Sequence, residues 1–242
     1  MAASRAGSAA GSNAWRSIVR DLLTGSIEVA SVVLEFRRCK EGILDLGSGR
    51  ESAGTADGRC KDAGIEKSHA ILIRKTLLTE TSLIIHWCSK EHGFIRTVAK
   101  GARRPASPYA GKLDLFYSAE LVWQPAKKSD LHTLKELEVT DFRLGLQASY
   151  LRVLCASYFV KLLEGVAEVE TPVESLYDLL RRALDYLTSH EPTRKAVLHF
   201  ERELAHDLGV QGDDNTPPIA SLRQMLHRVP VLREELWEQL TS

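Results

Sequence analysis

The stretch Val98-Ala-Lys-Gly-Ala-Arg-Arg-Pro-Ala-Ser107 carries the residues whose types and spacing best suit a chemical task. Lys100, Arg103 and Arg104 stand close together in it. Gly101 allows the backbone to turn sharply or to approach a ligand closely. A guanidinium group pairs with phosphate through two parallel hydrogen bonds, a geometry that an ammonium group does not offer. The stretch therefore indicates a binding site for a chain of phosphates.

Positive charge is concentrated around this stretch. Residues 67–112 carry nine basic and two acidic groups, whereas residues 113–242 carry 14 basic and 21 acidic groups. The formal net charge of zero hides this separation of a basic segment from an acidic one. Such a separation is typical of a protein in which one part binds a polyanion and the rest has a different function. From charge and strand face alone, we expect five further residues to contact phosphate: Arg96, Lys90, Arg74, Lys75 and Lys112.

Arg96 shares a strand face with Phe94, Val98 and Lys100 if the chain is extended there. A barrel face with cations and an aromatic ring suits single-stranded nucleic acid, since charge follows the backbone and rings stack on the bases. The sequence therefore predicts a nucleic-acid-binding face. The alternative is a protein-interaction adaptor whose basic face binds an acidic protein partner.

Nothing in the sequence predicts an enzyme. It has no nucleophile elbow, phosphate-binding loop, dinucleotide fingerprint or zinc-protease motif. His86 and His92 flank Cys88, but no third metal ligand lies within reach in the sequence. The four cysteines are scattered and form no Cys-x-x-Cys pair, which fits a reducing, cytoplasmic compartment. We expect no catalytic residues, no metal and no cofactor.

The elements that position the basic stretch are predicted from hydrophobic periodicity. Alternation of apolar and polar residues predicts five strands, at residues 69–75, 82–87, 94–100, 113–124 and 131–139. Five short strands without helices between them favour an oligonucleotide-binding (OB) fold barrel, and an SH3-like barrel is the alternative. After Asp141 the period changes to 3.6 residues, which predicts helices from residue 151 onward. The fold class is therefore α+β, a five-stranded OB-fold barrel followed by an all-α helical bundle.

The expected domains are an OB-fold DNA-binding domain at 67–141 and a helical domain at 142–242. Residues 1–66 read as a disordered or non-native N-terminal extension, although Trp15 to Phe36 is apolar enough for a helix. Gly47 to Gly64 contains five glycines and no large apolar residue, which is typical of a linker. Arginines and serines near the start are also compatible with an organellar transit peptide, which is the alternative for this segment. No run of 18 apolar residues exists, so no membrane span is expected.

Several motifs together resemble the bacterial RecO family of recombination and repair proteins. They are Leu77-Leu-Thr-Glu-Thr-Ser-Leu-Ile-Ile85, Ser89-Lys-Glu-His-Gly-Phe-Ile-Arg96, Val98-Ala-Lys-Gly-Ala-Arg-Arg104 and Glu201-Arg-Glu-Leu-Ala-His-Asp-Leu-Gly-Val210. The resemblance covers about residues 68–210. It assigns phosphate contact to Lys100, Arg103 and Arg104, which match the family's basic signature.

The resemblance implies a cytoplasmic, nucleoid-associated mediator that binds single- and double-stranded DNA, anneals complementary strands and helps load the recombinase. It also implies two partners, a RecR-like ring protein and the acidic C-terminal tail of single-strand binding protein. An acidic tail needs an apolar groove edged by a cation. The candidates are Arg143, Arg152, Lys161 and Arg223. Many family members carry a four-cysteine zinc module, but residues 211–216 hold no cysteine, so no zinc is expected here.

Overall fold

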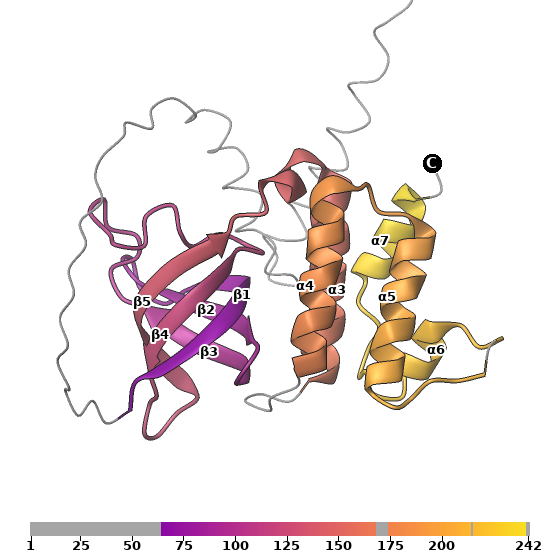
Figure 1. Ribbon diagram of the computed structural model, residues 1–242, viewed down its shortest axis with the longest axis horizontal. Coiled ribbons are helices and arrows are strands. Elements are labelled where there is room, and N and C mark those ends of the chain that lie inside the picture. Colours follow the sequence, from indigo (N-terminus) through magenta and orange to yellow (C-terminus); the bar gives the residue numbers. More distant parts are fainter. Residues whose placement is uncertain (1–63, 168–173, 214, 241–242) are drawn as a thin grey trace, which may run out of the picture. The chain divides into compact units, whose positions relative to one another are not determined.

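The computed structural model describes residues 64–167, 174–213 and 215–240 (Figure 1). All but the last three residues of the expected extension 1–66 lie outside these ranges, and so does the apolar stretch 15–36. The described part of the chain consists of strands followed by helices. The α+β class is therefore confirmed.

Five strands close into a barrel. They are β1 (Glu66–Leu77), β2 (Leu83–Ser89), β3 (Gly93–Ala99), β4 (Ser118–Gln124) and β5 (Leu131–Asp141). Their order around the barrel is β1-β2-β3-β5-β4, and all pairs are antiparallel except β3 with β5. This closed arrangement confirms the OB-fold barrel over the SH3-like alternative.

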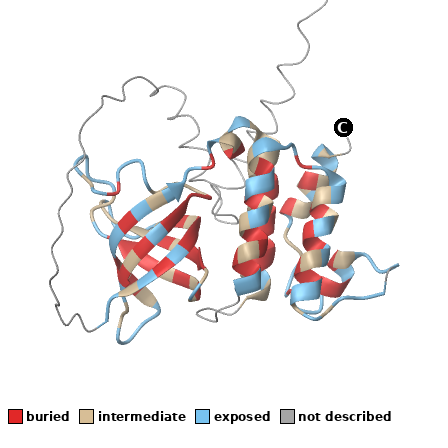
Figure 2. Cartoon of the chain, viewed as in Figure 1, coloured by how far each residue is buried: buried red, intermediate tan, exposed pale blue. Residues whose placement is uncertain are grey.

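The barrel interior is filled by every second side chain of its strands, as Figure 2 shows by the banding of buried positions. Trp87 lies at its centre and is 1% exposed. Its indole nitrogen donates to the hydroxyl of Thr97 at 2.8 Å, so the buried polar atoms of both side chains are paired. Tryptophan is large enough to fill much of such a narrow interior, which keeps the strand ends and their loops in place.

The fourth strand is shorter than the sequence predicts. Alternation predicts a strand from residue 113, but β4 begins at Ser118. Phe116 adopts a left-handed backbone with φ of 67°, and its N–H donates to the carbonyl of Leu72 at 2.7 Å. Phe116, Tyr117 and Ser118 are buried in succession, because this turn lies between the barrel and the helices. Because this turn packs on two sides, its residues are not buried alternately as the residues of a strand with one buried face are.

The helical part begins with a short 3-10 helix, η1 (Leu144–Ala148), and continues with α3 (Tyr150–Val166) and α4 (Glu174–Ser189). It ends with α5 (Arg194–Asp207), α6 (Pro218–Leu222) and α7 (Leu232–Gln239). Residues 168–173, which precede α4, lie outside the described residues. The helix α6 ends at Leu222, and the chain continues in single turns.

A second apolar core lies among the helices and includes part of the barrel's outer surface. Phe159 of α3 stacks on Phe200 of α5 with ring centroids 3.9 Å apart. Ile71, Ile73 and Cys88 point out of the barrel and are buried in this core. Burial raises the pKa of the Cys88 thiol to about 12, so the thiol stays protonated. The part of the outer β1–β2 surface around these residues is therefore covered and closed to other ligands.

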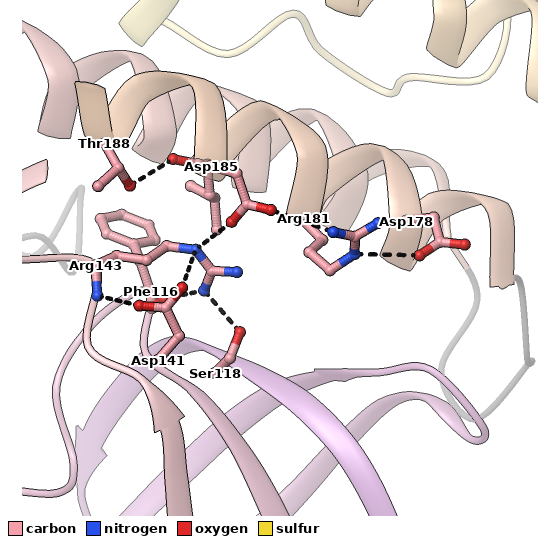
Figure 3. Close-up of polar contacts among 9 residues, drawn as sticks. Phe116, Ser118, Asp141, Arg143, Asp178, Arg181, Asp185 and Thr188 are labelled. Carbon is pink, nitrogen blue, oxygen red and sulfur yellow. Dashed lines mark hydrogen bonds and ion pairs between the residues drawn. The ribbon is translucent and has the colours of Figure 1, made fainter. Parts of the chain in front are cut away.

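Arg143 joins the barrel to the helices (Figure 3). It follows β5 in a left-handed conformation with φ of 41°, and its side chain is 3% exposed. Nη1 donates to the carbonyl of Phe116 at 2.8 Å and to the Ser118 hydroxyl at 2.7 Å. Nε donates to Asp185 of α4 at 3.0 Å. One guanidinium group thus satisfies acceptors that lie on β4, on the preceding turn and on a helix.

A second buried charge stabilises the C-terminal helices. Glu201 of α5 is fully buried, and it accepts from Tyr158 at 2.6 Å and from Nε of Arg233 at 2.8 Å. Burial, and then the charge and hydrogen bond of Glu201, raise the pKa of Tyr158 far above its usual range, so Tyr158 remains a donor. We expect Arg233→Ala to lower the free energy of unfolding by about 2 kcal/mol, because a buried carboxylate loses its counter-ion. Denaturant unfolding measures this, and Glu234→Ala on the exposed side of α7 serves as the control. Equal stabilities of the two variants would contradict the assignment.

His69 on β1 makes the fold sensitive to pH. Its ring contacts Glu91 at 3.0 Å and Glu120 at 3.4 Å, and the hydrogen bond to Glu91 is the main cause that raises the pKa of His69 above 6.5. A raised pKa stabilises the folded state below the unfolded value and stops doing so as pH rises through the folded value. We expect wild type to have a higher unfolding temperature than His69→Gln at about pH 6, with the difference gone by about pH 9. A difference that stays constant across this range would refute the assignment.

Candidate nucleic-acid interface

The loop that follows β3 presents three cations in a fixed turn. Gly101 has a φ of 68°, in the left-handed region that favours glycine, and Arg104 N–H donates to its carbonyl at 3.0 Å. Lys100, Arg103 and Arg104 are exposed on this turn. These three side chains therefore lie on a loop at the end of β3.

Both sides of this loop are held by the barrel. Arg103 donates from its backbone to the carbonyl of Thr81 at 3.1 Å and from Nη1 to the carbonyl of Glu80 at 3.0 Å. Further along, Tyr109 is 8% exposed and donates to the carbonyl of Leu134 at 3.2 Å. These contacts tie the loop to the β1–β2 connection and to β5. A loop held in this way keeps its cations in a preset arrangement, which lowers the entropy cost of binding.

The loop cations have no acidic partner in the part of the chain that the structure describes. No ion pair is formed there by Lys100, Arg103, Arg104 or Lys112. Lys112 is exposed too, but it stands at the far end of the loop. An exposed cation without a carboxylate nearby keeps its full charge available for a phosphate.

Arg74, His86 and Arg96 form a row across β1, β2 and β3 on the outer surface. The strand register places Arg74 beside His86 and His86 beside Arg96. Arg74 contacts Nδ1 of His86 at 3.1 Å and Glu164 of α3 at 3.3 Å, while Arg96 contacts Asp130. Arg96 lies on β3, four residues before Lys100, which stands in the turn after the strand and is about 13 Å away if the chain is extended. The charges of this row are partly compensated by Glu164 and Asp130.

Two of the expected residues lie elsewhere. Lys75 is 6% exposed and donates to the carbonyl of Leu113 and to Asp114, both at 3.1 Å. A β-bulge between Leu72 and Arg74 shifts the alternation of β1, so that Arg74 points outward and Lys75 inward. Lys90 lies in the β2–β3 turn, at the other end of β3 from Lys100, and pairs with Glu174 at 3.0 Å.

The aromatic ring expected on the binding face is occupied otherwise. Phe94 points out of the barrel but packs against the core of the helical part. Ile84 and Val98 lie beside each other on β2 and β3; both are aliphatic, and Val98 is buried. Neither these positions nor Phe94 offers an exposed aromatic ring for base stacking.

Sequence reasoning missed two lysines on the β4–β5 loop. Lys127 and Lys128 are exposed, and neither has an ion-pair partner among the described residues. The loop adjoins Arg96, because Leu131, the first residue of β5, pairs with Arg96 of β3. The charge count that drew attention to residues 67–112 excluded this loop, although two adjacent lysines in a turn between strands are a readable signal.

The metal pair considered from the sequence is not assembled. Cys88 faces the helical core, His86 contacts Arg74, and His92 packs edge-on against Trp123 with centroids 5.3 Å apart. In the described ranges, no group of three histidine, cysteine or acidic side chains is placed to hold a metal ion. Nor does any described helix have the length and hydropathy to span a membrane.

The four candidates for an acidic tail differ in their surroundings. Arg143 is buried, and Arg152 is 15% exposed and bonds Glu191 and two carbonyls. Lys161 pairs with Glu164 at 2.9 Å. Arg223 is exposed close to Met225, which is 45% exposed. Of the four, Arg223 alone combines an unengaged charge with an exposed apolar neighbour in the described structure.

The closed five-stranded barrel, its cationic loop and the helices packed on it define an OB-fold protein with an α-helical extension. Comparison with known families gives two matches that follow one another along the chain. The model described as recombination protein O N terminal matches residues 65–143, and recombination protein O C terminal matches residues 147–213. The chain belongs to the RecO family.

Curated relatives agree with this assignment. The chain is 33% identical over 144 residues to the DNA repair protein RecO of Nitrosospira multiformis, covering 60% of this chain and 58% of that protein. It is 33% identical over 151 residues to the protein of that name from Burkholderia pseudomallei, covering 62% of this chain and 54% of the relative. The chain thus spans little more than half the length of the curated relatives it matches.

Proposed function

We propose that this protein binds single-stranded DNA along the β3–β4 loop, anneals complementary strands and helps load recombinase during repair by homologous recombination. One observation supports this most directly: Lys100, Arg103 and Arg104 are exposed on one preset loop of an OB-fold barrel and form no ion pair with any described residue. Phosphate contacts of this kind supply most of the affinity of sequence-independent binding. Membership in a family whose relatives are named DNA repair proteins supports the same reading.

The proposal of strand annealing rests on the lack of a base-stacking ring at Phe94. A strand held by its phosphates, with Phe94 turned toward the helices, has no ring from that position inserted between its bases. Its base edges remain open to a complementary strand. Duplex DNA presents the same phosphates, so we propose that it binds as well, with little dependence on sequence.

The partners are proposed from the family resemblance. We propose that a RecR-like ring protein and the acidic tail of single-strand binding protein work with this chain, and that the tail binds near Arg223 and Met225. These roles need neither a catalytic residue nor a cofactor. We place the protein in the cytoplasm, associated with the nucleoid.

Fluorescence anisotropy with a short labelled oligonucleotide at about 100 mM salt tests the proposal, because charge-based binders remain measurable there. We expect saturable binding, competition by unlabelled DNA of any sequence, and faster annealing of complementary strands. Both functions allow an acidic peptide to bind, but only the competing function, an adaptor for acidic proteins, predicts that the oligonucleotide does not bind. That outcome would refute DNA binding by this chain.

A further inference from the structure

Arg96 and Asp130 form an ion pair where β3 meets the β4–β5 loop. The parallel pairing of β3 with β5 sets Arg96 beside Leu131, and the carboxylate of Asp130 contacts Nη2 of Arg96. Both side chains are exposed to a similar degree, 40% for Arg96 and 46% for Asp130. Nε of Arg96 is a buried atom without a hydrogen-bond partner in the described structure, so the exposed part of the guanidinium is the part that Asp130 contacts. This pair lies at the solvent boundary and is not a buried structural contact.

Two neighbouring lysines turn this pair into a local anion site. Lys127 and Lys128 stand three and two residues before Asp130 on the same loop, exposed and without an ion pair among the described residues. The loop therefore carries two cations and one anion, and the anion, Asp130, contacts Arg96. A carboxylate and a phosphate offer a guanidinium the same paired oxygens, so Asp130 occupies the position that a phosphate would take.

We propose that Arg96, Lys127 and Lys128 form a second phosphate subsite, and that Asp130 is its built-in competitor. The inference rests on the proposed DNA binding and adds a regulatory residue to it. An exposed ion pair contributes little to stability and exchanges readily, so an incoming phosphodiester can displace Asp130 from Arg96. Because the Arg96–Asp130 ion pair must break first, the affinity of the protein for DNA is lower than it would be without Asp130. Asp130 thus weakens binding at this end of the surface relative to the uncompensated β3–β4 loop.

Asp130→Asn tests this inference, because the amide keeps the shape of the side chain and removes its charge. Glu138→Gln is the matched control, because it also removes one exposed negative charge from the barrel. Glu138 lies on β5 and is paired with Glu120 of β4. Affinity for a labelled oligonucleotide is measured for both variants, and again in the R96A background. We expect D130N to bind about two- to fivefold more tightly, the range that one exposed ion pair allows. E138Q is expected to bind as wild type does, and the gain from D130N is expected to vanish with R96A.

The outcomes separate the subsite from the general proposal. Wild-type binding with no gain in D130N would overturn the competitor role while leaving DNA binding intact. A gain of equal size in E138Q, or one that persists with R96A, would show a general charge effect and overturn the subsite. Absence of wild-type binding would instead remove the proposed function itself. Unfolding temperatures of the variants establish that each is folded.

Discussion

Arg143→Ala is expected to lower the free energy of unfolding by about 3–4 kcal/mol, the largest effect on stability that we foresee for a single substitution. The variant removes a buried guanidinium and leaves the carbonyl of Phe116 and the hydroxyl of Ser118 without their donor. Each buried acceptor without a partner costs about 1–3 kcal/mol. Asp185 loses the same partner at its exposed edge, where water replaces it. Denaturant unfolding measures the loss.

Arg143→Lys separates charge from geometry. A lysine keeps the charge but cannot donate to Phe116, Ser118 and Asp185 together, so we expect it to recover less than half of the loss. Arg181→Ala is the surface control, since Arg181 also pairs with Asp185, at 3.2 Å, but is 43% exposed. We expect R181A to cost less than about 1 kcal/mol. If R143A were as stable as R181A, Arg143 would not be the junction between the barrel and the helices.

Replacing Lys100, Arg103 and Arg104 together by alanine is expected to weaken binding to single-stranded DNA about 100-fold at about 0.1 M salt. The estimate follows from counterion release, which assigns each phosphate contact a slope of about −0.7 and hence about a fivefold change at that salt. The three side chains lie on the surface, and the hydrogen bond from Arg103 Nη1 to the carbonyl of Glu80 is an exposed one, so the unfolding temperature is expected to stay close to that of wild type. Anisotropy titration measures the affinity.

A matched triple variant controls for net charge. R182A/K195A/R202A removes the same three charges from exposed positions of α4 and α5. It is expected to bind DNA within about twofold of wild type, because charges beyond a Debye length are largely screened. Equal losses in the two triple variants would mean that total charge, and not the loop, determines affinity.

The barrel and most helices were predictable because their signals are local. Alternation is clearest along β5 and the first part of β3, where one face is buried, and this pattern survives wherever a strand packs on one side. The helix α5 was readable for similar reasons: Thr193 caps its start by accepting from Ala196 N–H at 3.2 Å, and Gly209 follows its end with φ of 68°. Such signals lie within a few residues of the element that they define.

The exceptions depend on contacts that the sequence does not display. The start of β4 is displaced because Phe116 bonds to Leu72, 44 residues earlier, and packs under the helices. Lys75 points inward because of a bulge whose register only the pairing of β1 with β2 defines. Both errors came from treating alternation as unbroken.

The candidate site divides in the same way. Lys100, Arg103 and Arg104 were recognisable because a glycine turn and its cations form one short motif. The ion pairs of other cations were not recognisable from the sequence, because Lys90 pairs with Glu174 and Arg96 with Asp130 only after folding. Sequence indicates which charges are present, whereas the fold determines which of them are already paired.

The salt dependence of single-stranded DNA binding tests the central claim most directly. If about five phosphates are contacted, a plot of log affinity against log salt concentration should have a slope of about −3.5 for wild type. Loss of three contacts in K100A/R103A/R104A should reduce the slope to about −1.4. A slope in this variant equal to that of wild type would contradict the account, because the loop would then contribute no phosphate contact.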